Sequence, residues 1–240
     1  MFEIVCGIKV RANNAFDRNI VQAVIAHNRY RLPERFQKED VILDIGAHVG
    51  SFSYACLLRG AGRVHAFEPD EENFQICAEN LKEFAERVIL HNTAVWRSDV
   101  MDTPLLYTGP SESLERLNYG GGNVVFGDGR QIPVKSEPLD WVLSNIRTVR
   151  LMKLDCEASE WPILFSCRLL ECVDAIVGEY HEIGGKRSCA SIPLKAKLAG
   201  FETYTVEALV SFLNRHAFSV EILGKPDSNI GSFFARSLSK

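Results

Sequence analysis

Acidic residues and one histidine follow two hydrophobic segments that are predicted to be parallel strands. The segments are residues 150–155 and 172–178. In an open α/β sheet, ligands bind at the edge formed by the carboxyl ends of the strands. Carboxylates and an imidazole can accept a proton from a substrate hydroxyl, and a histidine has the ordinary pKa best suited to this role near neutral pH. The candidate catalytic residues are His181, Asp155, Glu157 and Glu179.

The same residues have alternative roles. Asp155, Glu179 and His181 could hold a divalent cation such as Mg²⁺, which would lower the pKa of a bound hydroxyl. Spacing alone does not show that the two strand ends converge. Glu157 could instead cap the helix predicted to start near Glu160. His181 could be a structural residue that bonds to Glu179 or to a loop carbonyl.

A second set of residues has the pattern of a nucleotide site. The buried strand predicted at 41–45 is followed by a turn between Gly46 and Gly50 and by a helix predicted at 51–58. Glycines let the backbone approach a ligand, and the helix N-terminus offers free N–H groups. Glu68, at the end of the strand predicted at 63–67, is placed to bond both hydroxyls of a ribose.

Asp44 limits the choice of nucleotide. It precedes the first glycine, where its charge would repel a pyrophosphate but not an ammonium group. S-adenosylmethionine combines a ribose with an amino-acid tail and no phosphate, so it is the expected cofactor. The loop 92–95 is expected to meet the adenine, with Trp96 packed on its ring or in the core. The candidate cofactor residues are Asp44, Gly46, Ala47, His48, Gly50, Glu68, Pro69, Asn92, Thr93, Ala94 and Asp155.

Elements that alternate between strand and helix patterns position these residues. Helices are predicted at 17–27, 70–85, 161–171 and 205–216, with another beginning at 139–143. A third strand is predicted at 87–91, and a short strand within 1–10. The segments 218–223 and 232–235 are expected to form a closing antiparallel hairpin. Short strands of an antiparallel excursion are expected at 105–107, 124–126 and 131–134, among the glycine turns of 97–137.

Composition indicates a globular α/β protein. The chain has 240 residues, 46% of them hydrophobic, and a formal net charge of -4. The absence of a long basic run argues against a nucleic-acid substrate, and no apolar stretch has the length of a membrane span. Seven cysteines without C-x-x-C spacing are expected to be reduced thiols, mostly in the core, of a cytoplasmic protein. A homodimer is a further expectation.

Several motifs together resemble the FkbM family of S-adenosylmethionine-dependent methyltransferases. They are VILDIGAHVG at 41–50, AFEP at 66–69, NTAV at 92–95, LMKLDCEASE at 151–160 and EYH at 179–181. Cys156 and Ala158-Ser159 depart from the family pattern, whereas the acids Asp155, Glu157 and Glu160 agree with it.

The resemblance implies a domain at 38–240 with a seven-stranded, mostly parallel, doubly wound Rossmann-like sheet and a C-terminal hairpin. Residues 1–37 would form an extension with a helix, and 97–137 and 183–203 would be insertions on the substrate side. It also implies O-methylation of a hydroxyl on a small-molecule natural product or glycan. Methylation of an amine or carboxylate on a peptide or amino sugar, and a non-catalytic protein of the same fold, are the alternatives.

Overall fold

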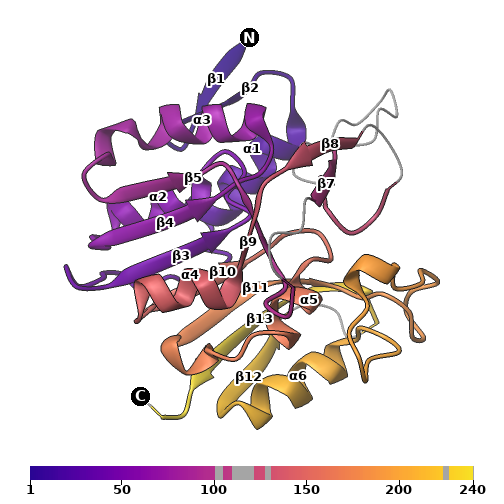
Figure 1. The fold of residues 1–240 in the computed structure, drawn as a ribbon. Coiled ribbons are helices and arrows are strands. Elements are labelled where there is room, and N and C mark those ends of the chain that lie inside the picture. Colours follow the sequence, from indigo (N-terminus) through magenta and orange to yellow (C-terminus); the bar gives the residue numbers. More distant parts are fainter. Residues whose placement is uncertain (101–104, 110–121, 128–130, 224–226, 240) are drawn as a thin grey trace.

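A seven-stranded sheet forms the centre of the molecule (Figure 1). The computed structural model describes residues 1–100, 105–109, 122–127, 131–223 and 227–239. The strand order is β12-β13-β11-β10-β3-β4-β5, and only β13 runs antiparallel to its neighbours. The strands are β3 (Val41–Ile45), β4 (Arg63–Phe67), β5 (Val88–His91), β10 (Leu151–Leu154), β11 (Ala175–His181), β12 (Phe218–Leu223) and β13 (Ile230–Ser237). The predicted doubly wound sheet with a closing hairpin is confirmed.

Helices cover both faces of this sheet. Successive strand residues point to opposite faces, and Ile42 and Leu43 accordingly belong to different core clusters. The Ile42 face packs against α2 (Ser51–Leu58), α3 (Glu71–Leu81) and η1 (Gln22–Ala26). The Leu43 face packs against α4 (Leu139–Ile146), α5 (Glu160–Phe165) and α6 (Val206–Arg215). The 3₁₀ turns are η2 (Lys82–Phe84), η3 (Leu170–Cys172) and η4 (Leu194–Ala196).

Side-chain caps fix the starts of two predicted helices. The Asp70 carboxylate accepts the Asn73 N–H at 2.9 Å, and the Thr205 hydroxyl accepts the Ala208 N–H at 3.4 Å. The helix predicted at 161–171 is too long, because α5 ends at Phe165. There the Ser166 hydroxyl donates to the Pro162 carbonyl at 2.6 Å, and the chain turns toward η3.

The fifth parallel strand lies three residues later than predicted. Cys172 belongs to η3, and β11 extends to His181 because β13 pairs with its whole length. In that register Glu179 faces Ser232 and His181 faces Ile230. The candidate residues of this strand therefore lie inside it, held by hydrogen bonds to β13, and do not follow it in a loop.

Three two-stranded sheets lie outside the central sheet. They pair β1 (Phe2–Val5) with β2 (Ile8–Arg11), β6 (Ala94–Trp96) with β9 (Ser136–Pro138), and β7 (Leu105–Thr108) with β8 (Gln131–Val134). The antiparallel excursion is thus confirmed at 105–107 and 131–134. The strand expected at 124–126 is wrong, because residues 124 and 125 form a bend and residue 126 is irregular. Several expected glycine turns of 97–137 lie wholly or partly outside the described residues.

The N-terminal segment packs against the central domain. Asn14 caps α1 (Ala15–Val21), which continues into the π-helix η1, so this helix begins two residues before the predicted start. Figure 1 shows β1, β2 and α1 grouped beside α3, at the end of the molecule opposite α6.

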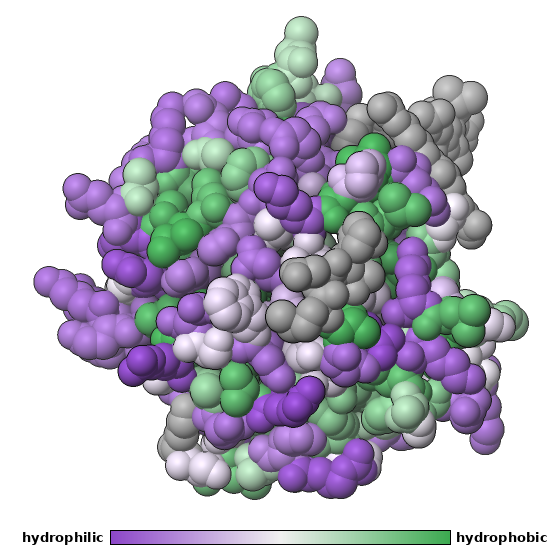
Figure 2. Space-filling view, viewed as in Figure 1, coloured by the Kyte–Doolittle hydropathy of each residue, from purple (hydrophilic) through white to green (hydrophobic). Residues whose placement is uncertain are grey.

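The surface is mixed in character. The face in Figure 2 is mostly hydrophilic, with apolar residues in separate groups. None of the helices in the described parts of the chain is long and apolar enough to cross a membrane. All seven cysteines are free, as predicted, but Cys6 and Cys189 are exposed and do not belong to the core.

Candidate active site

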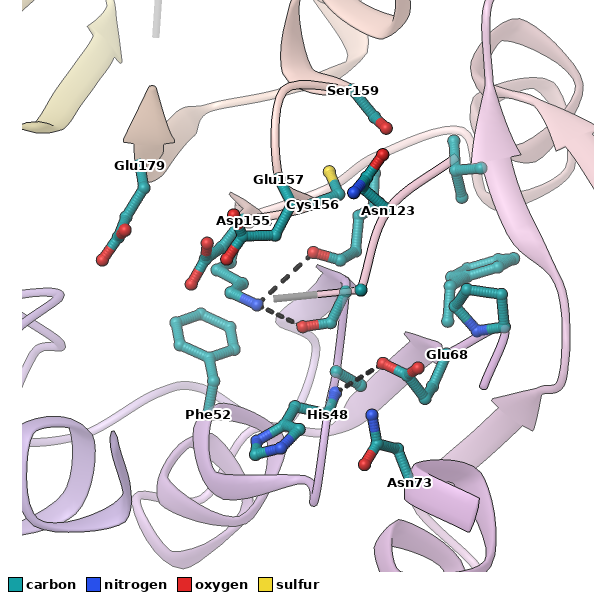
Figure 3. Close-up of a pocket in the computed structure, with 18 of the residues that line it drawn as sticks. His48, Phe52, Glu68, Asn73, Asn123, Asp155, Cys156, Glu157, Ser159 and Glu179 are labelled. Carbon is teal, nitrogen blue, oxygen red and sulfur yellow. Dashed lines mark hydrogen bonds between the residues drawn. The ribbon is translucent and has the colours of Figure 1, made fainter. Parts of the chain in front are cut away.

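A cavity of about 320 Å³ opens at the carboxyl edge of β3, β4 and β10. Figure 3 shows Glu68 and Asn73 on one side of it and Asp155, Glu157 and Glu179 on the other. The predicted cofactor residues that line this cavity are Gly46, Ala47, His48, Glu68, Pro69, Thr93, Ala94 and Asp155. We call the side that contains Glu68 the nucleotide half and the side that contains Asp155 the acid half.

The turn of residues 46–50, here called the glycine loop, is held by short backbone bonds. The N–H groups of Gly46 and Ala47 both donate to the Phe67 carbonyl, at 3.0 and 2.9 Å. Gly46 has φ +79°, and a Cβ at this position would lie 2.1 Å from the Asp155 carbonyl oxygen. Only glycine fits here, because the conformation is left-handed and the backbone of β10 is too close.

Gly50 has a different role from Gly46. It begins α2 with φ +86°, and a Cβ there would lie 2.9 Å from the Cys77 sulfur. Gly50 is not among the described residues that line the cavity. It therefore allows α2 and α3 to pack closely.

Glu68 is oriented by two backbone donors. Its carboxylate accepts the His48 N–H at 2.8 Å and the Asp70 N–H at 3.0 Å, while the side chain is buried (Figure 3). Burial raises the pKa of Glu68, against the opposing effects of His48 and of the two backbone bonds. Each carboxylate oxygen keeps a further lone pair, so the group can accept bonds from ribose hydroxyls.

Asp44 lies beneath the glycine loop and pairs with Lys153. The two charged groups are 3.4 Å apart, and both side chains are buried. The Lys153 ammonium also donates to the Gly46 carbonyl at 2.5 Å, and Ser53 donates to the other Asp44 oxygen at 2.7 Å. Asp44 is not among the described cavity-lining residues, whereas Lys153 is. Asp44 thus supports the loop through Lys153.

The segment that was expected to meet an adenine is divided between cavity and core. Thr93, Ala94 and Val95 line the cavity. Asn92 instead donates to the Glu68 carbonyl at 3.0 Å and is not among the described lining residues. Trp96 is 2% exposed within the core, so packing on an adenine ring is the wrong interpretation for this residue.

The acid half brings together the strand ends of β10 and β11. We define the acid cluster as Asp155, Glu157, Glu160, Glu179 and His181. His181 Nε2 lies 3.4 Å from Glu157 Oε2 and 3.8 Å from Glu179 Oε2, while its Nδ1 lies 3.4 Å from Glu160 Oε1. Glu160 also accepts the Cys156 N–H at 2.8 Å. The two strand ends, whose convergence the spacing alone did not show, therefore meet in the structure, and Glu160 lies with them.

The charges within the acid cluster alter its titration. Burial alone would lower the pKa of His181, but Glu160, Glu157 and Asp155 raise it to about 9. At this pKa the imidazole holds its proton near neutral pH, which differs from the ordinary histidine pKa on which the prediction of His181 as a base depended. Burial raises the pKa of Glu157 to about 7, with Asp155 and Glu160 adding to the effect and His181 opposing it. Lys153, His181 and Tyr30 outweigh burial and lower the pKa of Asp155.

Three candidate metal ligands are also close together, but they differ from the predicted set. Ligand atoms of Asp155, Glu157 and His181 lie within 4.8 Å of one another. Glu179 forms an ion pair with Arg29 and is not part of this group. Glu157 takes the place predicted for Glu179, because the turn after β10 has left-handed backbone at Glu157 and Ala158 that brings residue 157 toward His181.

The N-terminal segment supplies one wall of the cavity. Tyr30 is buried, packs edge-on against Phe52 and donates its hydroxyl to Asp155 Oδ2 at 2.8 Å. Burial raises the pKa of Tyr30 well above its ordinary value, so the hydroxyl stays protonated. Other lining residues that were not predicted include Phe16, Ile20, Val24, Arg29, Phe52, Asn73, Tyr107, Asn123, Lys153, Cys156 and Ser159.

The two expected insertions contribute unequally. Tyr107, Asn123 and Val124 place part of the 97–137 segment at the cavity. None of the residues of 183–203, a segment that the structure describes throughout, lines it. The 97–137 segment therefore supplies part of the cavity lining, whereas the 183–203 segment does not.

The sheet order and the cavity at its carboxyl edge define a Rossmann-like methyltransferase. A family model described as the methyltransferase FkbM domain matches residues 44–220. The chain thus belongs to the FkbM family of S-adenosylmethionine-dependent methyltransferases, and it is an enzyme of that class. The match begins at Asp44, so the N-terminal segment that lines the cavity lies outside it.

Solved structures with a similar fold are distant in sequence. EvdMO1 aligns with a TM-score of 0.51 and 13% identity, over 98% of this chain and 44% of its own. A precorrin-6y C5,15-methyltransferase from Geobacter metallireducens aligns with a TM-score of 0.46 and 15% identity, over 95% of this chain and 94% of its own. A putative RNA methyltransferase from Pyrococcus horikoshii aligns with a TM-score of 0.47 and 15% identity, over 94% of this chain and 85% of its own. No curated protein sequence matches significantly.

Proposed function

We propose that this enzyme transfers the methyl group of S-adenosylmethionine to a hydroxyl of a small-molecule natural product or sugar. The observation that carries the proposal is one cavity with two chemically different halves. Glu68 and the glycine loop suit an adenosine with an amino-acid tail, and the acid half lies opposite them. A cavity of about 320 Å³ suits small ligands and not a folded macromolecule.

The protein's own residues would align the acceptor and receive its proton. When bound, S-adenosylmethionine supplies an electrophilic methyl group on a sulfonium. Asp155 directly follows β10, beside Gly46, so its carboxylate lies next to the expected position of the methyl group. Tyr30 holds one oxygen of Asp155. The other oxygen, with Glu157, would take the proton of an acceptor hydroxyl as the methyl carbon exchanges its bond to sulfur for a bond to the acceptor oxygen, with S-adenosylhomocysteine as the leaving group.

Titration with S-adenosylhomocysteine tests the cofactor assignment. In Glu68→Gln the charged acceptor of the two backbone bonds and of the ribose hydroxyls is lost. We expect affinity to fall about 10- to 100-fold, since each hydrogen bond to a charged group contributes about 1.5–3 kcal/mol. Glu83→Gln, an exposed change outside the cavity, is the matched control and should bind like the wild type. Absence of binding to the wild-type protein would refute the proposal.

The position of the methyl group in the product tests the acceptor class. The enzyme is incubated with S-adenosylmethionine carrying a labelled methyl group and with matched polyols, glycosides, amino sugars and peptides. A methyl ether supports the proposal, whereas a methylamine or methyl ester supports the alternative on a peptide or amino sugar. Such acceptors need no strong base, so Glu157→Gln, which removes one of the two proposed proton acceptors, should reduce hydroxyl methylation and leave methylation of a free amine intact.

The remaining expected properties belong to the same proposal. The net charge of -4 supports a small-molecule acceptor over nucleic acid, and we propose a cytoplasmic homodimer without membrane association. Light scattering during size-exclusion chromatography gives the mass to compare with the 26.9 kDa of one chain.

A further inference from the structure

We propose that Asp155, Glu157 and His181 bind a divalent cation through one carboxylate oxygen of each acid and Nε2 of the histidine. The inference deepens the proposed function and rests on it, because the cation would hold the oxygen atoms of the acceptor. Two carboxylates and an imidazole are a suitable donor set for Mn²⁺ or a similar ion, and Mg²⁺ would compete for the same site.

The spacing of the donor atoms agrees with coordination. The three ligand atoms lie within 4.8 Å of one another. Bonds of about 2.0–2.2 Å to a common ion would place such atoms about 3–4.4 Å apart, so a small contraction completes the site. All three groups are attached to or directly follow β10 and β11, which are paired strands of the central sheet.

Glu160 is the independent observation that favours a cation. Its side chain is 1% exposed, and Oε2 has no hydrogen-bond partner among the described residues. Its other oxygen, Oε1, faces His181 Nδ1 at 3.4 Å, and Nδ1 is likewise buried without a hydrogen-bond partner in the described structure. Histidines that bind metals usually donate their second ring N–H to a carboxylate. Glu160 is placed to fix that N–H on Nδ1 and to leave Nε2 for the ion.

The charges around this point are unbalanced. The acid cluster has four carboxylates, and Arg29 forms an ion pair with one of them, Glu179. His181 is neutral when it binds an ion through Nε2, so it does not compensate the acids in that state. Lys153 is engaged by Asp44 and by the Gly46 carbonyl. Burial of carboxylates that no positive charge compensates is energetically unfavourable. A divalent cation would offset two of the three remaining negative charges.

The cation would act on the acceptor and not on the cofactor. Three protein ligands leave coordination positions open, and Asp155 and Glu157 line the cavity. An acceptor hydroxyl at such a position becomes more acidic, and its proton would pass to the Glu157 carboxylate oxygen that does not bind the ion. The preferred acceptor would present two neighbouring oxygen atoms, because adjacent open positions bind such a pair together.

Electron paramagnetic resonance of Mn²⁺ tests the site directly on the full chain after treatment with a chelator. Binding of one Mn²⁺ per chain, shown by loss of the free-ion signal and reversed by Mg²⁺, is expected. Glu157→Gln and Asp155→Asn should abolish binding. Glu160→Gln should weaken it about 10- to 100-fold, the usual effect of losing the partner of a metal-bound histidine. Glu83→Gln should bind like the wild type.

The outcomes separate this inference from the proposed function. Absence of Mn²⁺ binding at millimolar concentration, or equal binding by wild type and Glu157→Gln, would overturn the cation site. Methyl transfer at an unchanged rate after chelation would overturn it as well and leave the proposed function intact. The Mn²⁺ signal needs neither cofactor nor acceptor, so it reports on the site even if S-adenosylhomocysteine does not bind.

Discussion

The nucleotide half of the cavity comes largely from one continuous stretch, residues 44–70, whereas the acid half combines three segments that are distant in sequence. Glu68 and the glycine loop are joined by backbone bonds within that stretch. Asp155 and Glu157 follow β10, Glu179 and His181 belong to β11, and Tyr30 comes from the N-terminal segment. Local structure can therefore form the first half, but only the complete tertiary fold can form the second.

Lys153 is the residue that links the two halves. It lies on β10 next to the acid half, and its ammonium group reaches Asp44 and the Gly46 carbonyl in the nucleotide half. Substitutions at this link and on either side of it can show whether the halves depend on each other.

The largest effect is expected for Lys153→Met. Removal of the ammonium leaves Asp44 charged and buried, which typically destabilises a protein by about 3–5 kcal/mol. Urea denaturation would measure the loss. The double variant Asp44→Asn/Lys153→Met is the control and should recover much of the stability, since no buried charge remains. A single variant as stable as the wild type would show that the buried pair does not link the halves.

The second largest effect is expected for Gly46→Ala, which should disrupt the nucleotide half. The left-handed backbone costs about 1–2 kcal/mol for any residue with a Cβ. At Gly46 that atom would also lie 2.1 Å from the Asp155 carbonyl, so the loop must move and S-adenosylhomocysteine binding should be lost. Gly200→Ala is the matched control, because Gly200 has φ +85° and no atom within 4 Å of the added Cβ. Calorimetric titration that gave equal affinity for both variants would contradict the prediction.

Tyr30→Phe should affect only the acid half. The change removes the hydroxyl that donates to Asp155 and keeps the ring packed on Phe52. We expect kcat to fall about 10-fold, with affinity for S-adenosylhomocysteine within about 2-fold of the wild type. Tyr54→Phe, on α2 and against Phe84, is the control. An equal loss of cofactor affinity in Tyr30→Phe would show that the halves are not independent.

The smallest effect concerns His65, which lies outside both halves. Burial, with His91 and Arg63, lowers its pKa from 6.5 to about 4. The unfolded chain therefore binds a proton that the folded protein excludes, and stability from this source falls as pH decreases from 6.5 toward 4. The melting temperature of the wild type should fall between pH 7 and pH 5. In His65→Phe the same change of pH should lower the melting temperature by at least ~2 °C less. An equal fall in melting temperature for the two proteins would show that the pH effect comes from other titratable groups, including those of the cavity.

The sequence was sufficient for the nucleotide half because its signals are local. Gly46, Glu68 and the strand before each can be recognised within a few residues, and the structure places both at the cavity. The role of Asp44 could not be derived in the same way. Its partner Lys153 is more than a hundred residues away, and only the parallel pairing of β3 and β10 brings them together.

The acid half was predicted as a set of residues and not as an arrangement. Its acids were found because they end strands, but the position of His181 depends on how far β13 extends β11. The raised pKa of His181 follows mainly from Glu160, which the sequence indicated only as an acid that agrees with the family pattern and not as a partner of His181. Tyr30 carried no signal, since its bond to Asp155 joins residues 125 positions apart.

The position of the N-terminal segment outside the family match also matters for protein engineering. The residues that line the cavity from this segment include Phe16, Ile20 and Val24, which precede the matched region and belong to α1 and η1. An expression fragment trimmed to the matched region would therefore lose a wall of its own binding site. By the same reasoning, randomising these three apolar positions would vary the shape offered to an acceptor while every residue of the glycine loop stays unchanged.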